Sequence, residues 1–350
     1  MCLANSCCAA EMKILNMSSD TVTRLTAIGL LLLLFGLTIG AFFWMTAVPG
    51  QSHLGPLPPL TSAQSRLTET LKVDVTAIAS RPHNVQYPRA LEAVAQHIEQ
   101  ELEAVGYAVQ RHPYEASGRP VRNIEVVIQP TSTNVKTLIV GAHYDSAGDA
   151  PGANDNGSGA AALLALARRM TDLRGRAAIR IRLVFFVNEE PPFFQTTKMG
   201  SAVYAKRLRQ SGEDVLGMIS LETLGYYSDQ AGSQHYPFPL GLRYPGTGNF
   251  VAFVGMLPSR SFVRQTVEAF RKEARFPSVG GVAPGALQGI GWSDHWSFAN
   301  EGFPALMVTD TAPFRYPYYH TTRDTPDKVN YQRLARVVSG LEAVIRHWPS

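Results

Sequence analysis

Short apolar runs alternate with segments of helical periodicity between residues 137 and 347, and this alternation constrains the fold more than any other feature of the sequence. The apolar run 137–142 is followed by a Gly/Pro/Asp loop, by the Ala/Leu-rich segment 159–170 and by a second strand-like segment at 179–187, which ends in the apolar run 183–187. Near-continuous apolar runs are typical of buried parallel strands, and a β-α-β order lays helices across the sheet. The sequence therefore predicts an α/β fold with a mixed, largely parallel central sheet flanked by helices on both faces.

Other segments extend this alternation toward both ends of the folded part. Residues 226–258 interrupt it, and their content of Gly, Pro and aromatic residues predicts a long surface excursion near the site. The further helices are expected at 68–80, 89–105, 200–210, 262–274 and 331–347, and the further strands at 107–114, 123–128, 215–221 and 305–308.

An apolar stretch of a different kind lies near the N-terminus. Residues 25–48 contain no charged side chain, and a helix of about 20 apolar residues spans a bilayer, whereas the apolar part of a signal peptide is nearer 7–15 residues. We therefore expect an uncleaved single-pass membrane anchor. Because Lys13 and Arg24 precede this stretch and no basic residue follows it until Arg66, the N-terminus is expected in the cytoplasm and the folded domain in the periplasm or outside the cell.

These features divide the chain into four expected parts. Proline and glycine recur between residues 49 and 66, a composition that suits a tether. The parts are a cytoplasmic tail at 1–24, a transmembrane anchor at 25–48, a Pro/Gly-rich linker at 49–66 and a folded domain at 67–350.

The cysteines restrict the chemistry of the folded domain. All three, Cys2, Cys7 and Cys8, lie in the tail, where we expect reduced thiols, with lipidation as the alternative. No disulfide framework can form beyond them, so any metal in the folded domain must be held by His, Asp and Glu. The net charge of +4 comes without a block of Lys and Arg, which argues against nucleic acid as a partner.

Acidic residues and histidines follow the predicted strands. His143 and Asp145 come directly after the first apolar run, and Glu189 and Glu190 come directly after the second. Such residues taken singly are also common in solvated turns, but two carboxylates at the exit of a buried strand repel each other unless a cation is present. Ligands of open parallel sheets bind beyond the carboxyl ends of the strands. The pattern therefore indicates a metal site, to which two later residues contribute from the ends of further strands: Glu222 and His320.

Asp155 lies in the segment Gly-Ala-Asn-Asp-Asn-Gly-Ser-Gly at residues 152–159. Glycine and asparagine tolerate unusual backbone angles, so this carboxylate is a candidate to bridge two metal ions about 3.5–4 Å apart. A helix-capping loop is the alternative interpretation. A serine nucleophile at Ser158 is disfavoured because the spacing of a nucleophile elbow is missing.

Five segments together resemble the signature blocks of metallopeptidase family 28, which includes zinc aminopeptidases, glutamate carboxypeptidases and, more distantly, glutaminyl cyclases. The resemblance runs from about Leu67 to the C-terminus and implies a zinc exopeptidase-like fold with two zinc ions per chain. One ion would be bound by His143, Asp155 and Glu222, and the other by Asp155, Glu190 and His320. The segments are Gly141–Asp145, Gly152–Gly159, Asn188–Glu190, Ser293–His295 and Tyr319–Thr321.

The resemblance also implies roles for residues around the ions. Glu189 would be the general base, taking a proton from a metal-bridging water and passing it to the leaving amine. Asp145 would orient His143, Tyr319 would donate its hydroxyl to the oxyanion, and Asp294 would lie close to the base. Many aminopeptidases of this family carry Asp at the position of Glu222, so the geometry there is expected to differ.

The sequence thus favours a membrane-anchored dinuclear zinc aminopeptidase that acts on peptides with a free N-terminus. Pro191–Phe194, directly after the base, is expected to form a wall of the site. A single-zinc glutaminyl cyclase-like transferase is the first alternative, and a non-catalytic peptidase-like ectodomain that binds a partner is the second.

Overall fold

The computed structural model describes residues 19–132 and 135–348, which form two compact units, one ending at Ala47 and one beginning at Val48. Cys2, Cys7, Cys8 and Lys13 lie outside the described residues. The first unit contains helix α2 (Ser19–Thr46), which is long and apolar enough to cross a membrane; a signal sequence near the N-terminus can also meet this criterion. The division into tail, anchor, linker and domain stays a prediction.

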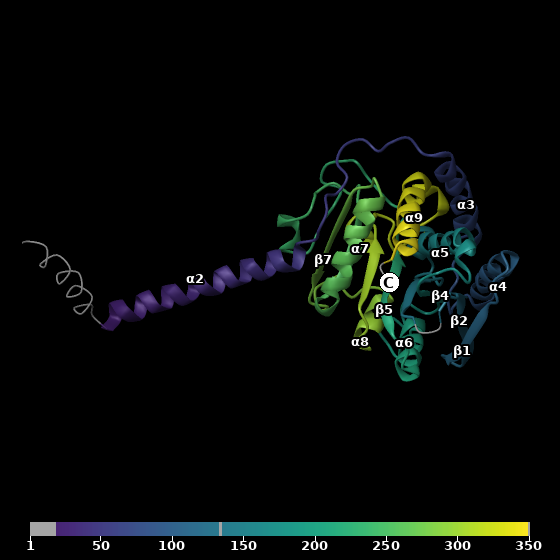
Figure 1. The fold of residues 1–350 in the computed structure, drawn as a ribbon, viewed down its shortest axis with the longest axis horizontal. Helices are drawn as coiled ribbons and strands as arrows, with labels where there is room; N and C mark the ends of the chain where they lie inside the picture. The colour runs from purple at the N-terminus through teal and green to yellow at the C-terminus, as the bar shows by residue number, and fades with distance from the viewer. Residues whose placement is uncertain (1–18, 133–134, 349–350) are drawn as a thin grey trace, which may run out of the picture. The chain divides into compact units, whose positions relative to one another are not determined.

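The second unit is built on one eight-stranded sheet with the strand order β1-β2-β4-β3-β5-β8-β6-β7 (Figure 1). Four adjacent strands in its middle, β4, β3, β5 and β8, are parallel to one another. The other pairs are antiparallel except β6 with β7, which confirms the predicted mixed, largely parallel sheet. The strands are β1 (Gln110–Ala116), β2 (Arg119–Ile128), β3 (Thr137–His143), β4 (Arg180–Phe186), β5 (Val215–Glu222), β6 (Val251–Met256), β7 (Ser278–Ala283) and β8 (Ala305–Thr309).

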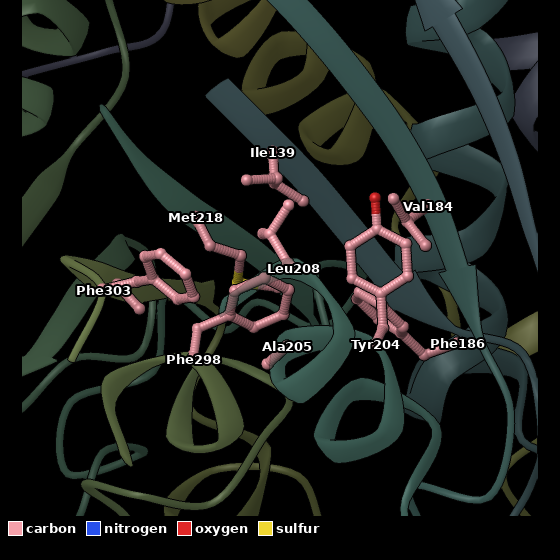
Figure 2. Packing of buried hydrophobic residues seen from close by; sticks show 10 residues of the cluster. Ile139, Val184, Phe186, Tyr204, Ala205, Leu208, Met218, Phe298 and Phe303 are labelled. Carbon is pink, nitrogen blue, oxygen red and sulfur yellow. The ribbon is translucent and has the colours of Figure 1, made fainter. Parts of the chain in front are cut away.

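Helices cover both faces of the sheet, as predicted. Helices α3, α4, α5, α7 and α9 pack against one another on one face, and α6 and α8 pack together on the other. Figure 2 shows the core beneath α6 and α8, where the rings of Phe186, Tyr204 and Phe298 meet with centroids 5.7–6.1 Å apart. The helices of this unit are α3 (Ser62–Ile78), α4 (Pro88–Ala104), α5 (Gly159–Arg169), α6 (Gly200–Ser211), α7 (Arg260–Glu273), α8 (His295–Asn300) and α9 (Tyr331–Arg346).

The prediction that residues 226–258 form one surface excursion is wrong at its end. Residues 251–256 are strand β6, which lies inside the sheet between β8 and β7. Strand β7 was not predicted either, because it contains Gly280 and Gly281; a Cβ at Gly280 would lie 2.7 Å from Val267 of α7. Glycine is thus required there for helix and strand to approach, and it weakens the strand pattern in the sequence. Helix α8 is only six residues long, too short to show a period.

The segment predicted to be a linker has no helix or strand until Ser62, yet it belongs to the second unit and makes hydrogen bonds with it. The Arg271 guanidinium donates to the carbonyls of Pro49 and Gly50, both at 2.9 Å. Further along, the Arg336 guanidinium donates to the carbonyl of Pro58 at 2.6 Å. Because arginine satisfies carbonyls that no sheet or helix would pair, this stretch is held along the domain rather than left free.

Candidate metal centre

Five potential metal ligands meet at the carboxyl end of the four parallel central strands. His143 is the last residue of β3 and Glu222 the last of β5. Glu190 follows the end of β4, and His320 follows β8 after a longer loop. Asp155 comes from the loop that leads into α5. The structure therefore brings together the side chains that the sequence placed after separate strands.

The distances between these side chains divide them into two groups of three. The Nε2 atom of His143 lies 3.4 Å from Asp155 Oδ1 and 3.4 Å from Glu222 Oε2. The Nε2 atom of His320 lies 3.0 Å from Asp155 Oδ2 and 3.4 Å from Glu190 Oε1. Ligand atoms of a tetrahedral zinc ion with bonds of about 2.0–2.1 Å are about 3.3–3.4 Å apart. The distances from the two histidines to these carboxylates, 3.0–3.4 Å, are thus close to those between zinc ligands.

Asp155 is common to both groups, and each of its two carboxyl oxygens faces a different histidine. Its backbone is held by neighbouring asparagines rather than by a regular helix. The Asn156 side chain donates to the Leu221 carbonyl at 2.8 Å and accepts from the backbone N–H of Thr223 at 3.0 Å. The loop that carries Asp155 is therefore fastened to the end of β5, beside Glu222.

Unpaired polar atoms show that these residues fit a cation. His143 Nε2 and Glu190 Oε1 are buried and have no hydrogen-bond partner among the described residues. Buried polar groups are nearly always partnered in folded proteins, and imidazole and carboxylate are ordinary zinc ligands. The donor set and its unsatisfied atoms are thus those of a metal site made of His, Asp and Glu.

The carboxylates of the centre repel one another. Burial raises the pKa of Glu189 well above its usual value; the positive charge of His143 opposes this shift, and the charge of Glu190 adds to it. Burial and the charge of Asp155 raise the pKa of Glu190 to about 7. Burial also raises the pKa of Glu222. A divalent cation would relieve this crowding of negative charge.

The two histidines of the centre carry positive charge that compensates the negative charge of the carboxylates. Burial lowers the pKa of His143, but the charge of Glu222 and the nearby carboxylates of Asp145 and Asp155 outweigh this effect and raise the pKa well above its usual value. The effect of burial is outweighed in the same way at His320, where the nearby carboxylates of Asp155 and Glu190 raise its pKa to about 11. Metal binding must displace these protons, because only neutral imidazole is a ligand.

Asp145 was predicted to orient His143, and the structure gives its carboxylate a different set of contacts. The backbone N–H groups of Glu189 and Glu190 donate to its Oδ1 and Oδ2 at 3.1 and 3.2 Å. Its main-chain carbonyl accepts from His143 Nδ1 at 3.1 Å, while the carboxylate is 3.7 Å from that nitrogen. The residue therefore touches His143 through its backbone and fixes the Glu189–Glu190 loop through its side chain.

The other predicted site residues surround the two groups. Glu189 Oε2 lies 3.9 Å from His143 Nε2. The Tyr319 ring stacks on His320 with centroids 3.9 Å apart, and burial raises the pKa of the tyrosine far above its usual value. Asp294 is fully buried, its carboxyl oxygens have no hydrogen-bond partner among the described residues, and burial raises its pKa to about 7. All these side chains gather at one place, and their catalytic roles stay predictions.

Two connected pockets open from the centre. The smaller one lies directly over the ligands, with Pro191 and Phe194 in its wall, whereas Phe193 belongs to the core. The larger one, which has more lining residues, continues beneath the 236–250 loop. Its lining has a single charged residue, Glu222 at its junction with the smaller pocket. The remaining lining is mostly apolar and includes Leu240, Phe250, Val254, Val279, Val282, Ile290, Met307 and Phe314.

Several residues that support the ligands were not found from the sequence. The Ser293 hydroxyl donates to Glu222 Oε2 at 2.8 Å, and the Asp324 carboxylate accepts from the backbone of the Asp155 loop. Thr223, directly after Glu222, has a φ of 44°, a left-handed conformation that β-branched residues rarely adopt and that is concentrated at functional sites. Ser293 lies in the Ser293–His295 segment, but its contact with Glu222 could not be predicted because the two residues are distant in the chain. No local sequence signal marks Asp324 or Thr223.

Comparison with known proteins agrees with this geometry. A family model described as peptidase family M28 matches residues 123–345. The chain is 34% identical over 307 residues to the uncharacterized protein YfbL of Escherichia coli (strain K12), a match that covers 85% of this chain and 90% of that protein. It is 27% identical over 213 residues to leucine aminopeptidase 1 of Arthroderma otae, covering 57% of this chain and 51% of that protein, so it spans about half the length of that relative.

Solved structures share the fold at low sequence identity. An aminopeptidase from Aneurinibacillus sp. strain AM-1 superposes with a TM-score of 0.61 at 17% identity, covering 81% of this chain and 94% of that chain. The glutaminyl cyclase of Fimbriiglobus ruber superposes with a TM-score of 0.59 at 17% identity, covering 86% of this chain and 99% of that chain. The two likenesses are nearly equal and therefore support the fold without choosing between the two reactions.

Proposed function

Because the chain belongs to peptidase family M28, we propose that it is an aminopeptidase that hydrolyses the N-terminal bond of peptides with two bound zinc ions. The observation that carries the proposal is the pair of ligand groups that share Asp155. One zinc would be held by His143, Asp155 and Glu222, and the other by Asp155, Glu190 and His320. When bound, the two ions supply Lewis acidity, which polarises a carbonyl and lowers the pKa of water toward about 7.

Glu189 is proposed as the general base. Its carboxylate lines the smaller pocket beside the ligand groups, and burial raises its pKa, which strengthens it as a base and makes proton return to the leaving amine easier. Asp145 holds the backbone of Glu189 by a 3.1 Å hydrogen bond. The base is thus positioned before substrate binds. A fixed position is required because the same carboxylate would take a proton from water and give it to the leaving amine.

Tyr319 is proposed to stabilise negative charge on the substrate. Its side chain lines both pockets, and its raised pKa keeps the hydroxyl protonated in the neutral range. A protonated hydroxyl at this position can donate to an oxyanion that forms at the scissile carbonyl.

Charge around the pockets favours an aminopeptidase over a carboxypeptidase. Binding of a C-terminal carboxylate commonly uses arginine or lysine, and neither residue lines either pocket in the described part of the chain. A free N-terminal ammonium group would instead meet Glu189, Glu190 and Glu222 in the smaller pocket. The surroundings therefore suit the amino end of a peptide.

The larger pocket suggests which N-terminal residues are preferred. It adjoins the ligand groups at Glu222, and most of its lining residues are apolar. Because its walls are mostly apolar, we propose that it accepts large apolar first side chains, such as Leu, Met or Phe, and disfavours Asp, Glu, Lys and Arg.

A panel of aminoacyl chromogenic amides tests the proposal. Turnover is expected for apolar aminoacyl groups, to be lost with a chelator and restored with zinc, and to be absent from N-acetylated substrates. Cleavage of C-terminal residues instead, or activity unaffected by the chelator, would contradict the assigned function.

The cyclase alternative shares the fold but needs one zinc ion. The complete ligand group around His143 favours two ions. One zinc per chain together with cyclisation of N-terminal glutamine would replace the aminopeptidase with the cyclase.

We also propose that α2 anchors the protein in a membrane, with the peptidase domain in the periplasm or outside the cell. The support is the length and apolar composition of the helix. Recovery of an uncleaved chain in the membrane fraction, with the domain open to external protease, is the expected result; a soluble chain that lacks the helix would contradict it.

A further inference from the structure

A buried carboxylate that is not a ligand lies next to the proposed metal centre. Asp324 is fully buried and accepts hydrogen bonds from the backbone N–H of Asn154 (Oδ1, 2.8 Å) and from that of Asp155 (Oδ2, 3.1 Å). The Tyr316 hydroxyl also donates to Oδ1 at 2.8 Å. The carboxylate thus accepts three hydrogen bonds, two of them from the loop that carries the shared ligand Asp155.

The main chain of Asp324 contributes to the same contact. Its carbonyl accepts from the backbone N–H of Ala153 at 3.1 Å. Three successive N–H groups, from Ala153 to Asp155, therefore point at this one residue. Since the peptide plane before Asp155 determines where its Cα–Cβ bond points, these hydrogen bonds determine where its two carboxyl oxygens lie.

Asp324 is also tied to the other ligand of the same group. It follows His320 by four residues, and its N–H donates to the carbonyl of Thr321 at 3.0 Å, closing the turn between them. His320 itself has a φ of 55°, an uncommon conformation that persists only where the surroundings fix it. One residue thus holds both the Asp155 loop and the His320 turn, which are distant from each other in the sequence.

The same arrangement occurs a second time in the centre. The Asp145 carboxylate accepts from the successive N–H groups of Glu189 and Glu190, as Asp324 accepts from those of Asn154 and Asp155. Both are charge-assisted hydrogen bonds in a buried place, where such contacts are strongest. The repeated geometry indicates that it serves to position the loops that bear ligands.

We propose that Asp324 is a positioning residue that sets the separation between Asp155 Oδ2 and His320 Nε2, now 3.0 Å, and so governs zinc affinity at that half of the centre. This inference rests on the proposed two-zinc function. It assigns to Asp324 no contact with zinc or substrate.

The test compares two buried carboxylates, each replaced by its amide. Asp324→Asn puts an NH₂ group against backbone N–H donors and removes one acceptor. Glu125→Gln is the matched control, because Glu125 is also fully buried and bonded, to His112 and Arg182, but touches no ligand. Zinc affinity is measured on each purified full-length protein by competition with a chromogenic chelator, and unfolding of the metal-free protein is followed in parallel.

Asp324→Asn is expected to lower the affinity for one of the two zinc ions about 10- to 100-fold, the usual effect of removing a partner that orients ligands. It is also expected to lower kcat more than it raises KM. Glu125→Gln is expected to lower the unfolding temperature while both zinc affinities stay within about twofold. If Asp324→Asn behaves like Glu125→Gln, Asp324 has only a structural role and the proposal is overturned.

If Asp324→Asn does not fold, the variant Tyr316→Phe provides a second test of the proposal. This variant removes one of the hydrogen bonds to the Asp324 carboxylate and should lower the affinity for the same zinc ion by a smaller factor. Unchanged affinity for both ions would count against the proposal. Wild-type protein that binds two zinc ions but hydrolyses no peptide would refute the proposed reaction while leaving this inference intact.

Discussion

Replacing Ser293 by alanine should weaken zinc binding without removing a ligand. The Ser293 hydroxyl donates to Glu222 Oε2 at 2.8 Å and lies 2.8 Å from the Ser220 hydroxyl, and both serines are fully buried. A hydrogen bond to a charged group contributes about 1.5–3 kcal/mol. If Glu222 is free to turn away once this bond is lost, that energy corresponds to about 10- to 150-fold in zinc affinity at the group that contains His143.

The control separates this effect from a general loss of stability. The Ser259 hydroxyl is also buried and accepts from the backbone N–H of Ala305 at 3.0 Å, away from the ligands. Ser259→Ala should destabilise the protein by about 1–3 kcal/mol and leave zinc affinity unchanged. Calorimetric zinc titration of both variants, with chelator competition for tight binding, gives the comparison. Equal zinc affinities in Ser293→Ala and wild type would refute the idea that the hydroxyl positions Glu222.

Three further predictions follow from the centre and its pockets. Glu189→Gln should lower kcat by at least about 10²- to 10⁴-fold, as expected for a general base, with zinc content by metal analysis unchanged; near wild-type turnover would reject this role. Val254→Phe should reduce the larger pocket and lower kcat/KM for leucyl and phenylalanyl amides relative to alanyl amide, and an unchanged ratio would exclude that pocket as the side-chain site. Zinc affinity should rise between pH 6 and 8, because Glu190, with a pKa of about 7, is increasingly deprotonated over that range and His320 must release its proton to bind zinc. Calorimetric titration in buffers of different ionisation enthalpy should show this proton release. A zinc affinity that does not change with pH would contradict the prediction.

The central strands could be predicted because burial on both faces makes them continuously apolar. Strand β3 is buried at every position, and β4 is apolar and buried from Leu183 to Phe186. Strand β7 lacks this pattern, since Gly280 is present to admit Val267 of the neighbouring helix. Its neighbour β6 was included in a Gly/Pro-rich stretch whose composition resembles that of a loop.

The ligands were easier to predict than their supports. His143 and Glu190 follow apolar runs and lie in recognisable segments, whereas the roles of Ser293 and Asp324 depend on contacts with residues distant in the chain. The pocket walls could not be predicted either, because β6, β7, β8 and the 236–250 loop each contribute a few side chains. These side chains come close to one another only when the sheet has formed.

Crystallographic location of zinc by anomalous scattering tests the two-zinc centre most directly. The expected result is two peaks about 3.5–4 Å apart, one within bonding distance of His143 and Glu222, the other within bonding distance of Glu190 and His320, and both next to Asp155. A zinc-saturated crystal with a single peak, or with peaks away from these side chains, would contradict it.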